Sequence, residues 1–337
     1  MKVRIKTISE ATGFSPATVS NALNHKKGVN QETASAIFQK AQELGYFEEN
    51  KISKIKFVIY KKIGLVVENS PFFELMMAGA EAECRNLGME MTLVYLDERR
   101  DDFKTQFAAL CDAKDSAVIL LGTEMEDRDI YLIRELKMPL VVIDYWNSDM
   151  SFNAVMIDNA DSVRQAVRYL IGLGHQKIGY LKGNFRIRPF RSREKGYRDA
   201  LLGAGIPYDE KYTVLLRPDM DGAYHDMERY LSGKPELPTA FISDNDMIGL
   251  GAMKAMFESG VRIPQDVSII GFDDLPYSSM AYPPLTTVFV PKEEIGRVAV
   301  RRLNNIINGG DMNALKIEVC TTFRNRSSVK DLRQKQD

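Results

Sequence analysis

Two helix signatures lie next to each other close to the N-terminus. The first begins with Thr7 and Glu10, whose side chains can cap each other's backbone amides at a helix start, and it ends at Gly13. The second begins two residues later with Ser15-Pro16, a capping residue followed by proline at the first helical position. Two short helices joined by so tight a turn predict a helix-turn-helix unit.

A third helical pattern starts near Asn30 and stops at Gly45, so we expect residues 7–45 to form one three-helix unit. The outward face of its second helix carries short, uncharged side chains that can hydrogen-bond to bases or contact a thymine methyl: Ala17, Thr18, Ser20, Asn21 and Asn24. A three-helix bundle with no ligand is the alternative, but the tight turn and the uncharged face favour DNA binding.

Charge is distributed unevenly along the chain. Residues 1–62 contain 11 Lys and Arg against 5 Asp and Glu, whereas the remainder contains 34 against 41. A basic N-terminal unit on an acidic body indicates that this unit contacts a polyanion. A solvated lysine-rich segment would give the same counts.

Several classes of protein are disfavoured by the composition. Cys84, Cys111 and Cys320 are far apart and form no CxxC pair, which favours packing roles in a reducing compartment. The histidines lack metal-ligand spacing, so we expect no metal and no cofactor. No apolar stretch approaches the roughly 20 residues that span a bilayer, and there is no signal-peptide core. We therefore expect a cytoplasmic protein with no membrane partner, associated with the nucleoid when bound to DNA.

From residue 63 onward, short β-branched runs alternate with helical patterns. The runs cover residues 63–67, 91–95, 117–121, 140–143, 177–181, 239–242 and 267–270. Strands that alternate with helices predict parallel sheets covered on both faces. The resumption of the pattern at residue 177 indicates a second lobe, and ligands of such sheets bind where the strands end.

The first two helices resemble the headpiece of the lactose/galactose repressor (LacI–GalR) family, in the run from Ile8-Ser9-Glu10-Ala11-Thr12-Gly13-Phe14 to Ser15-Pro16-Ala17-Thr18-Val19-Ser20-Asn21-Ala22-Leu23-Asn24. Residues 36–46 resemble that family's third helix, and the similarity continues to about residue 329. The resemblance implies an α-helical helix-turn-helix headpiece followed by a two-lobed, periplasmic-binding-protein-like α/β sensor domain. The expected parts are a headpiece at 1–46, a hinge or linker at 47–61, an effector-binding domain at 62–329 and a charged tail at 330–337. Its lobes would comprise 62–159 with 291–316, and 160–288 with 317–329.

The resemblance also assigns DNA contacts by position. Pro16, Ala17 and Asn21 match the family's base-reading positions, and Ile5 and Lys6 lie where its first residues approach bases. Positions that touch phosphates or the groove wall are matched by Ser15, Thr18, Ser20, Asn24 and Asn30.

The connector after the headpiece departs from the family. Glu48 and Glu49 stand where the family has Pro and Asn, and Ile52 and Ile55 replace its Ala and Leu. In the family this segment is a hinge helix whose Leu wedges between base pairs in the minor groove. Ile55 is therefore a candidate wedge, although carboxylates beside DNA and β-branched residues in a short helix are unfavourable. A flexible linker is the alternative.

The residues just beyond the predicted strand ends form a candidate effector site: Ser70, Phe72, Phe73, Asp144, Trp146, Arg193, Asn245 and Asp273. Aromatic rings beside Asp, Asn and Arg suit a sugar, since rings stack on its apolar face while polar groups bind its hydroxyls. By the resemblance, Arg193, Asn245 and Asp273 match effector-contacting positions of the family, and Asp144 with Phe72-Phe73 matches them on the opposite lobe.

Other roles are open to some of these residues. Phe72 or Trp146 could simply fill the interface between the lobes, and we expect Asp246 to cap the helix that follows it. Arg188 or Arg191 could pair with an anionic effector, such as a sugar phosphate or a sugar acid.

These features predict a sequence-specific DNA-binding transcriptional regulator, of the repressor type, controlled allosterically by a sugar-like effector bound between the lobes. Its expected partners are double-stranded operator DNA, the small-molecule effector and a second copy of the chain. We expect a dimer and not a tetramer, because the C-terminal segment lacks the leucine heptads of a tetramer-forming helix. A sugar-binding receptor without a DNA role is the first alternative. We do not expect an enzyme, since the chain has no GxGxxG after a strand, no nucleophile elbow and no P-loop.

Overall fold

The computed structural model describes residues 3–23, 28–46, 52–68, 70–113, 115–148, 152–309 and 313–333. The N-terminal unit consists of α1 (Ile5–Thr12), α2 (Pro16–Leu23) and α3 (Gln31–Glu43). Its core contains Ile8, Val19, Ala22, Ala34, Ile37 and Ala41. Helix α1 begins earlier than predicted: Arg4, and not Thr7, is its N-cap residue, and the Arg4 N–H donates to the Thr7 hydroxyl at 3.4 Å.

The first lobe is built on a parallel sheet with the strand order β11-β5-β4-β3-β1-β2. The strands are β1 (Lys54–Lys61), β2 (Glu90–Asp97), β3 (Ser116–Leu121), β4 (Leu140–Ile143), β5 (Asn153–Ile157) and β11 (Lys316–Val319). The helices of this lobe are α5 (Pro71–Asn86), α6 (Phe103–Cys111), η1 (Asp127–Asp129), α7 (Ile130–Glu135) and α13 (Lys292–Ile307). Every residue of β3 is buried, as expected for a strand covered on both faces.

The second lobe repeats this plan with the strand order β12-β10-β9-β8-β6-β7. Its strands are β6 (Ile178–Gly183), β7 (Thr213–Leu216), β8 (Ala240–Ser243), β9 (Ser268–Asp273), β10 (Thr286–Phe289) and β12 (Thr322–Arg324), of which β12 is antiparallel to its neighbour. Its helices are α8 (Asn159–Gly172), α9 (Arg188–Gly203), η2 (Glu210–Tyr212), α10 (Met220–Ser232), α11 (Asp246–Glu258) and α12 (Pro276–Met280).

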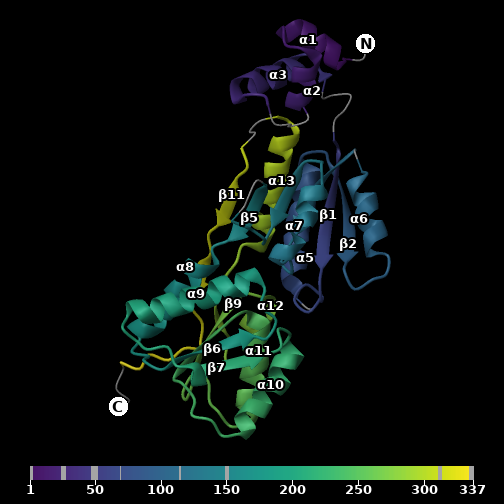
Figure 1. Cartoon of the computed structure of the whole chain (residues 1–337). Helices are drawn as coiled ribbons and strands as arrows, with labels where there is room; N and C mark the ends of the chain where they lie inside the picture. The colour runs from purple at the N-terminus through teal and green to yellow at the C-terminus, as the bar shows by residue number, and fades with distance from the viewer. Residues whose placement is uncertain are drawn as a thin grey trace.

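The chain crosses between the lobes three times, after β5, before α13 and after β11 (Figure 1). Because β11 pairs with β5, the last crossing follows residue 319, beyond the expected boundary at 317. The headpiece lies at the end of the first lobe that is remote from the second lobe (Figure 1). Within the described ranges, no helix has the length and apolar character needed to cross a membrane.

The first strand differs from the predicted one. Residues 54–61, expected to be part of the linker, form β1 and pair with both β2 and β3. Residues 63–67, predicted to be the first strand, form turns instead. The connector between the headpiece and the first lobe is therefore shorter than predicted, ending at residue 53 and not at residue 61.

Candidate functional site

The candidate DNA-reading side chains lie on α2. Pro16 and Ala17 are exposed in its first turn, and Asn21 is half-buried one turn later. The start of the helix is held by Ser15, whose hydroxyl accepts a hydrogen bond from the Thr18 N–H at 3.1 Å and lies 2.8 Å from the Thr18 hydroxyl. These short side chains leave the amino end of α2 open to a base edge, as major-groove recognition requires.

The other predicted DNA contacts lie around this helix. Lys6 is exposed and Ile5 is half-buried on α1, and Ser20 is half-buried on α2. Asn30 caps α3, because its Oδ1 accepts a backbone hydrogen bond at 2.8 Å from the residue three positions later. Asn24 lies outside the described residues.

The structure contradicts a wedge role for Ile55. This side chain is fully buried in β1, where it pairs with Met91 of β2 on one side and Ala117 of β3 on the other. Insertion into a minor groove would break both pairings and expose core surface to water, which is unfavourable in proportion to the apolar area involved. The prediction that Ile55 contacts DNA is therefore wrong.

A small cavity lies between the lobes, beyond the carboxyl ends of their strands. It is lined from the first lobe by Val66, Ser70, Phe72, Phe73, Thr123, Asp144 and Ile157, and from the second by Ile187, Pro189, Phe190, Arg193, Asn245 and Asp273. All of the predicted effector residues except Trp146 therefore meet here. The cavity has a volume of about 20 Å³, enough for little more than one water molecule. A sugar can enter only if the lobes or the lining side chains move.

Two carboxyl groups face this cavity from opposite lobes. Asp144 follows β4 and Asp273 ends β9, and both have a positive φ, 65° and 116°, which is rare for residues other than glycine. Asp144 Oδ2 accepts a hydrogen bond from the Thr123 hydroxyl at 2.9 Å. Among the described residues, the Oδ1 atoms of both aspartates are buried without a hydrogen-bond partner. Burial raises the pKa of each carboxyl group to about 6. Buried acceptors without donors are groups that a bound ligand can satisfy.

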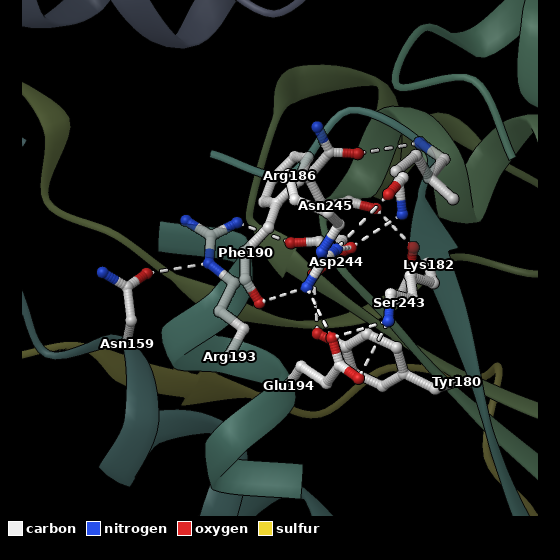
Figure 2. A network of polar contacts seen from close by, with 12 residues as sticks. Asn159, Tyr180, Lys182, Arg186, Phe190, Arg193, Glu194, Ser243, Asp244 and Asn245 are labelled. Carbon is white, nitrogen blue, oxygen red and sulfur yellow. Dashed lines mark hydrogen bonds and ion pairs between the residues drawn. The ribbon is translucent and has the colours of Figure 1, made fainter. Parts of the chain in front are cut away.

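A buried guanidinium completes the polar set. Arg193 donates from Nε to Asn159 Oδ1 at 2.8 Å and from Nη1 to the backbone oxygen of Asp244 at 2.5 Å (Figure 2). Its Nη2 lies 3.5 Å from Asp273 Oδ1, and its Cζ atom lies 3.7 Å from the centre of the Phe272 ring. These contacts fix the guanidinium in place and leave N–H groups for a ligand.

A further network behind Arg193 was not singled out in the sequence. Asp244 accepts hydrogen bonds from the Tyr180 hydroxyl at 2.6 Å and from the Gly183 N–H at 2.7 Å, and it pairs with Arg186 (Figure 2). Arg186 also donates to Glu194 at 2.9 Å. This network holds the end of β8, from which Asn245 enters the cavity. Arg186 and Glu194 lie close together in the sequence, but nothing local connects them to Asp244, which is 58 residues from Arg186.

Asn245, and not Asp246, caps α11. The Asn245 Oδ1 accepts a hydrogen bond at 2.9 Å from a backbone N–H in the first turn of that helix, so the capping role predicted for Asp246 is wrong. Asp246 instead accepts from the Leu275 N–H at 2.8 Å and from the hydroxyls of Ser278 and Thr287 at 2.6 Å. Burial raises its pKa to about 7. These bonds anchor the loop that follows Asp273.

The remaining candidates lie outside the cavity lining. The Lys316 ammonium is 4.6 Å from the ring centre of Trp146, which places this ring against β11. Arg188 reaches from the second lobe to pair with Asp127 of the first. Arg191 is exposed. None of these side chains lines the cavity.

A larger apolar hollow lies on the second lobe, and none of its residues lines the cavity between the lobes. Its volume is about 440 Å³, and α10, α11 and α12 contribute Met220, Leu250, Met253, Phe257, Tyr277 and Met280 to its lining. Three large side chains in the lining are strongly exposed: Phe257 (68%), Met280 (79%) and Tyr282 (90%). A cluster of exposed apolar side chains of this kind marks an interaction surface.

Comparison with known proteins gives matches over nearly the whole chain. Residues 4–48 match the model of the lacI family of bacterial regulatory proteins, and residues 167–329 match a periplasmic binding protein-like domain. The probable HTH-type transcriptional repressor ExuR of Bacillus subtilis is 30% identical over 337 residues, which cover 98% of this chain and 99% of ExuR. The ribose operon repressor of Haemophilus influenzae is 29% identical over 332 residues, which cover 98% and 99% of the two chains.

Solved structures show the same fold. A complex of the transcriptional regulator CelR with cellobiose aligns with a TM-score of 0.74 at 25% identity, covering 97% of this chain and all of that chain. A lac repressor dimer bound to operator and an anti-inducer aligns with a TM-score of 0.72 at 22% identity, covering 97% and 99% of the two chains.

Proposed function

The chain belongs to the lacI family of bacterial regulatory proteins. From this we propose that it is a transcriptional repressor whose affinity for operator DNA depends on a bound small-molecule effector. The carrying observation is a pair of buried carboxyl oxygens, Asp144 Oδ1 and Asp273 Oδ1, which line one cavity from opposite lobes and accept no hydrogen bond from the described residues. Among those residues, Asp273 Oδ1 has only the 3.5 Å ion-pair contact with Arg193. A ligand that donates hydrogen bonds to both favours one spacing of the lobes over others. That preference is the differential affinity that effector control requires.

Operator recognition is assigned to the headpiece. Pro16, Ala17 and Asn21 would contact bases from the amino-terminal half of α2, and Ser15 and Thr18 would hold that helix against phosphates. Because this reader carries no charged side chain on its exposed face, its sequence preference rests on the Asn21 amide and on apolar contacts to thymine methyl groups. A repressor that binds operator DNA would act in the cytoplasm.

A neutral sugar is the effector that suits the cavity. Its hydroxyl groups would donate to Asp144 and Asp273 and accept from Arg193, while Phe72 and Phe190 would cover an apolar face of the ring. An anionic sugar suits the cavity less well, because Arg188 is already paired with Asp127 and does not line the cavity. The relative CelR has been solved as a complex with cellobiose, an uncharged sugar.

Thermal shift with matched sugars tests this assignment. We would compare glucose with glucuronate, and add cellobiose and ribose, since saturation at 100 times Kd stabilises a protein by about 2.7 kcal/mol. We expect a neutral sugar to raise the melting temperature more than its acid, and Asp144→Asn to reduce the shift. The exposed variant Asp101→Asn is the control. Equal shifts by glucose and glucuronate would contradict the neutral-sugar assignment.

A second copy of the chain is the partner proposed for the apolar hollow on the second lobe. Two headpieces are needed to read two half-sites, and a lac repressor dimer on its operator has the same fold. Met280, which is 79% exposed, would be buried against the partner. Sedimentation should show that Met280→Glu shifts the dimer toward monomer, whereas Leu202→Glu, at a side chain that is 81% exposed on α9, should not. A Met280→Glu protein that remains dimeric would contradict this interface.

A further inference from the structure

Lys292, the first residue of α13, is a buried lysine whose contacts join the two lobes. Its ammonium group donates to the backbone oxygens of Asp273, Asp274 (3.3 Å) and Val290 (3.1 Å). Lys292 begins α13 of the first lobe, whereas Asp273 ends a strand of the second lobe. Lys292 is only 5% exposed. These hydrogen bonds stabilise the buried ammonium group, since a buried charge without partners is strongly unfavourable.

The peptide group that Lys292 binds belongs to an effector-site residue. Asp273 has a φ of 116°, and its side chain contributes one of the two buried carboxyl oxygens that accept no hydrogen bond from the described residues. The Lys292 ammonium also lies 5.7 Å from the ring centre of Phe72, another residue of the cavity lining. Burial lowers the pKa of Lys292, and the neighbouring Asp273 opposes this shift. A movement of the Asp273 loop on effector binding would therefore displace the first residue of α13, because Lys292 is hydrogen-bonded to that loop.

Helix α13 is packed as a rigid element against α5. A Cβ atom placed on Gly296 would lie 2.1 Å from the backbone oxygen of Met76, and one placed on Gly79 would lie 2.0 Å from the backbone oxygen of Glu293. The two helices thus touch backbone to backbone. Sixteen residues at 1.5 Å per residue give α13 a length of about 24 Å.

The far end of α13 meets the headpiece. A Cβ atom placed on Gly309, two residues after the helix, would lie 2.2 Å from Cδ1 of Phe38 on α3. Phe38 is only 5% exposed, and Gly309 is one of the residues packed against its ring. Figure 1 shows α13 running from the region between the lobes to the underside of the headpiece.

We propose that Lys292 is the coupling residue of this regulator: it ties the Asp273 loop to α13, and α13 carries the displacement through Gly309 to Phe38 and the headpiece. This inference rests on the proposed function, because it assumes that an effector binds at Asp273. It adds a route to the headpiece that does not pass through the connector at residues 47–53. Lys292 acts through the backbone of Asp273 and contacts neither DNA nor the cavity, so it is a positioning residue.

Hydrogen–deuterium exchange of the full chain without any sugar tests the route directly. In Lys292→Met, the peptides that contain residues 273–275, 304–309 and 34–41 should all exchange at least about twofold faster than in the wild type. The substitution removes the hydrogen bonds to the Asp273 loop directly, and by the proposed route it also loosens the end of α13 and the part of α3 that packs against it. Lys292→Arg, which keeps the charge and the donors, should restore slower exchange. Lys104→Met, an exposed lysine on α6 of the same lobe, is the matched control and should change none of them. Faster exchange at 273–275 with unchanged exchange at 34–41 would overturn the proposed route.

Operator binding provides a second readout, which separates this inference from the proposed function. Fluorescence anisotropy would give the operator Kd with and without cellobiose or ribose, and couplings of this kind are typically about 5- to 150-fold. In Lys292→Met we expect the operator Kd without sugar to stay within about twofold of the wild type, while the sugar-induced change falls to less than a third. An unchanged ratio in Lys292→Met overturns the coupling role. If neither sugar changes operator binding by the wild type, this counts against the proposed function. The exchange experiment, which uses no sugar, then tests the Lys292 route by itself.

Discussion

Replacing Asp144 by asparagine is expected to stabilise the protein while it weakens the effector response. Burial raises the pKa of this carboxyl group from its ordinary value of 3.8 to about 6, so the folded chain holds its proton more tightly than the unfolded chain. Above pH 6 the folded protein must accommodate a charge that is better solvated after unfolding. Asparagine has nearly the same shape and never carries that charge.

The magnitude and its sign follow from proton linkage. A raised pKa means that the native state binds more protons between pH 3.8 and 6, so the contribution of Asp144 to stability falls as pH rises through that window. One pKa unit corresponds to about 1.4 kcal/mol, so the stabilisation by Asp144→Asn should reach about 3 kcal/mol at pH 7.5 and only about 1 kcal/mol at pH 4.5. These values are upper estimates, because asparagine brings its own unsatisfied amide.

Urea unfolding at pH 4.5 and pH 7.5, followed by fluorescence and circular dichroism, would measure the effect. The matched control is Asp101→Asn at an exposed position, which should change stability little at either pH. If Asp144→Asn is less stable than the wild type at pH 7.5, or gains equally at both pH values, the carboxyl group does not carry the burial penalty inferred for it.

Two further substitutions test the fold on which the site depends. Ile55→Ala should lower the unfolding free energy by about 2–5 kcal/mol through cavity formation in the core, while the operator affinity of the folded protein stays the same; weaker operator binding without loss of stability would revive a DNA-contacting role. Gly296→Ala should lower the melting temperature and loosen α13 from α5, because the new methyl group would meet the backbone of Met76, whereas Gly203→Ala on α9, with no atom within 4 Å, should be neutral or stabilising. Equal melting temperatures for the two glycine variants would contradict the close contact of these helices.

The candidate effector residues could be identified from the sequence because they follow strands. In parallel sheets the carboxyl ends of the strands lie at one edge, so Asp144, Asn245 and Asp273 were expected to meet. Their backbone conformations were not predictable, since nothing in the local sequence requires a positive φ at Asp144 or Asp273. Trp146 lies only two residues beyond Asp144, yet its ring contacts Lys316 of β11, a neighbour that is distant in the chain.

The first strand could not be located correctly for a similar reason. Residues 63–67 are β-branched and apolar, which predicts a strand, but Glu124 accepts hydrogen bonds from the backbone N–H groups of Lys62, Ile63, Gly64, Val66 and Val67. That carboxylate replaces the sheet partners these amides would otherwise need. A contact across about 60 residues leaves no local pattern. The resemblance to the family's hinge segment, and not the residue pattern of β1 itself, placed residues 54–61 in the linker.

The measurement that tests the central claim most directly is operator binding by the full chain with and without a sugar that gives a thermal shift. With an operator fragment carrying two half-sites, we predict that the sugar changes the Kd at least about fivefold, the low end of typical coupling between sites. The same sugar should leave the operator Kd of an Asp144→Ala, Asp273→Ala double variant unchanged, because alanine removes both carboxyl groups and with them the acceptors for the sugar hydroxyls. A wild-type Kd that is the same with and without the sugar, while the sugar still binds in the cavity, would contradict control of DNA binding by the cleft.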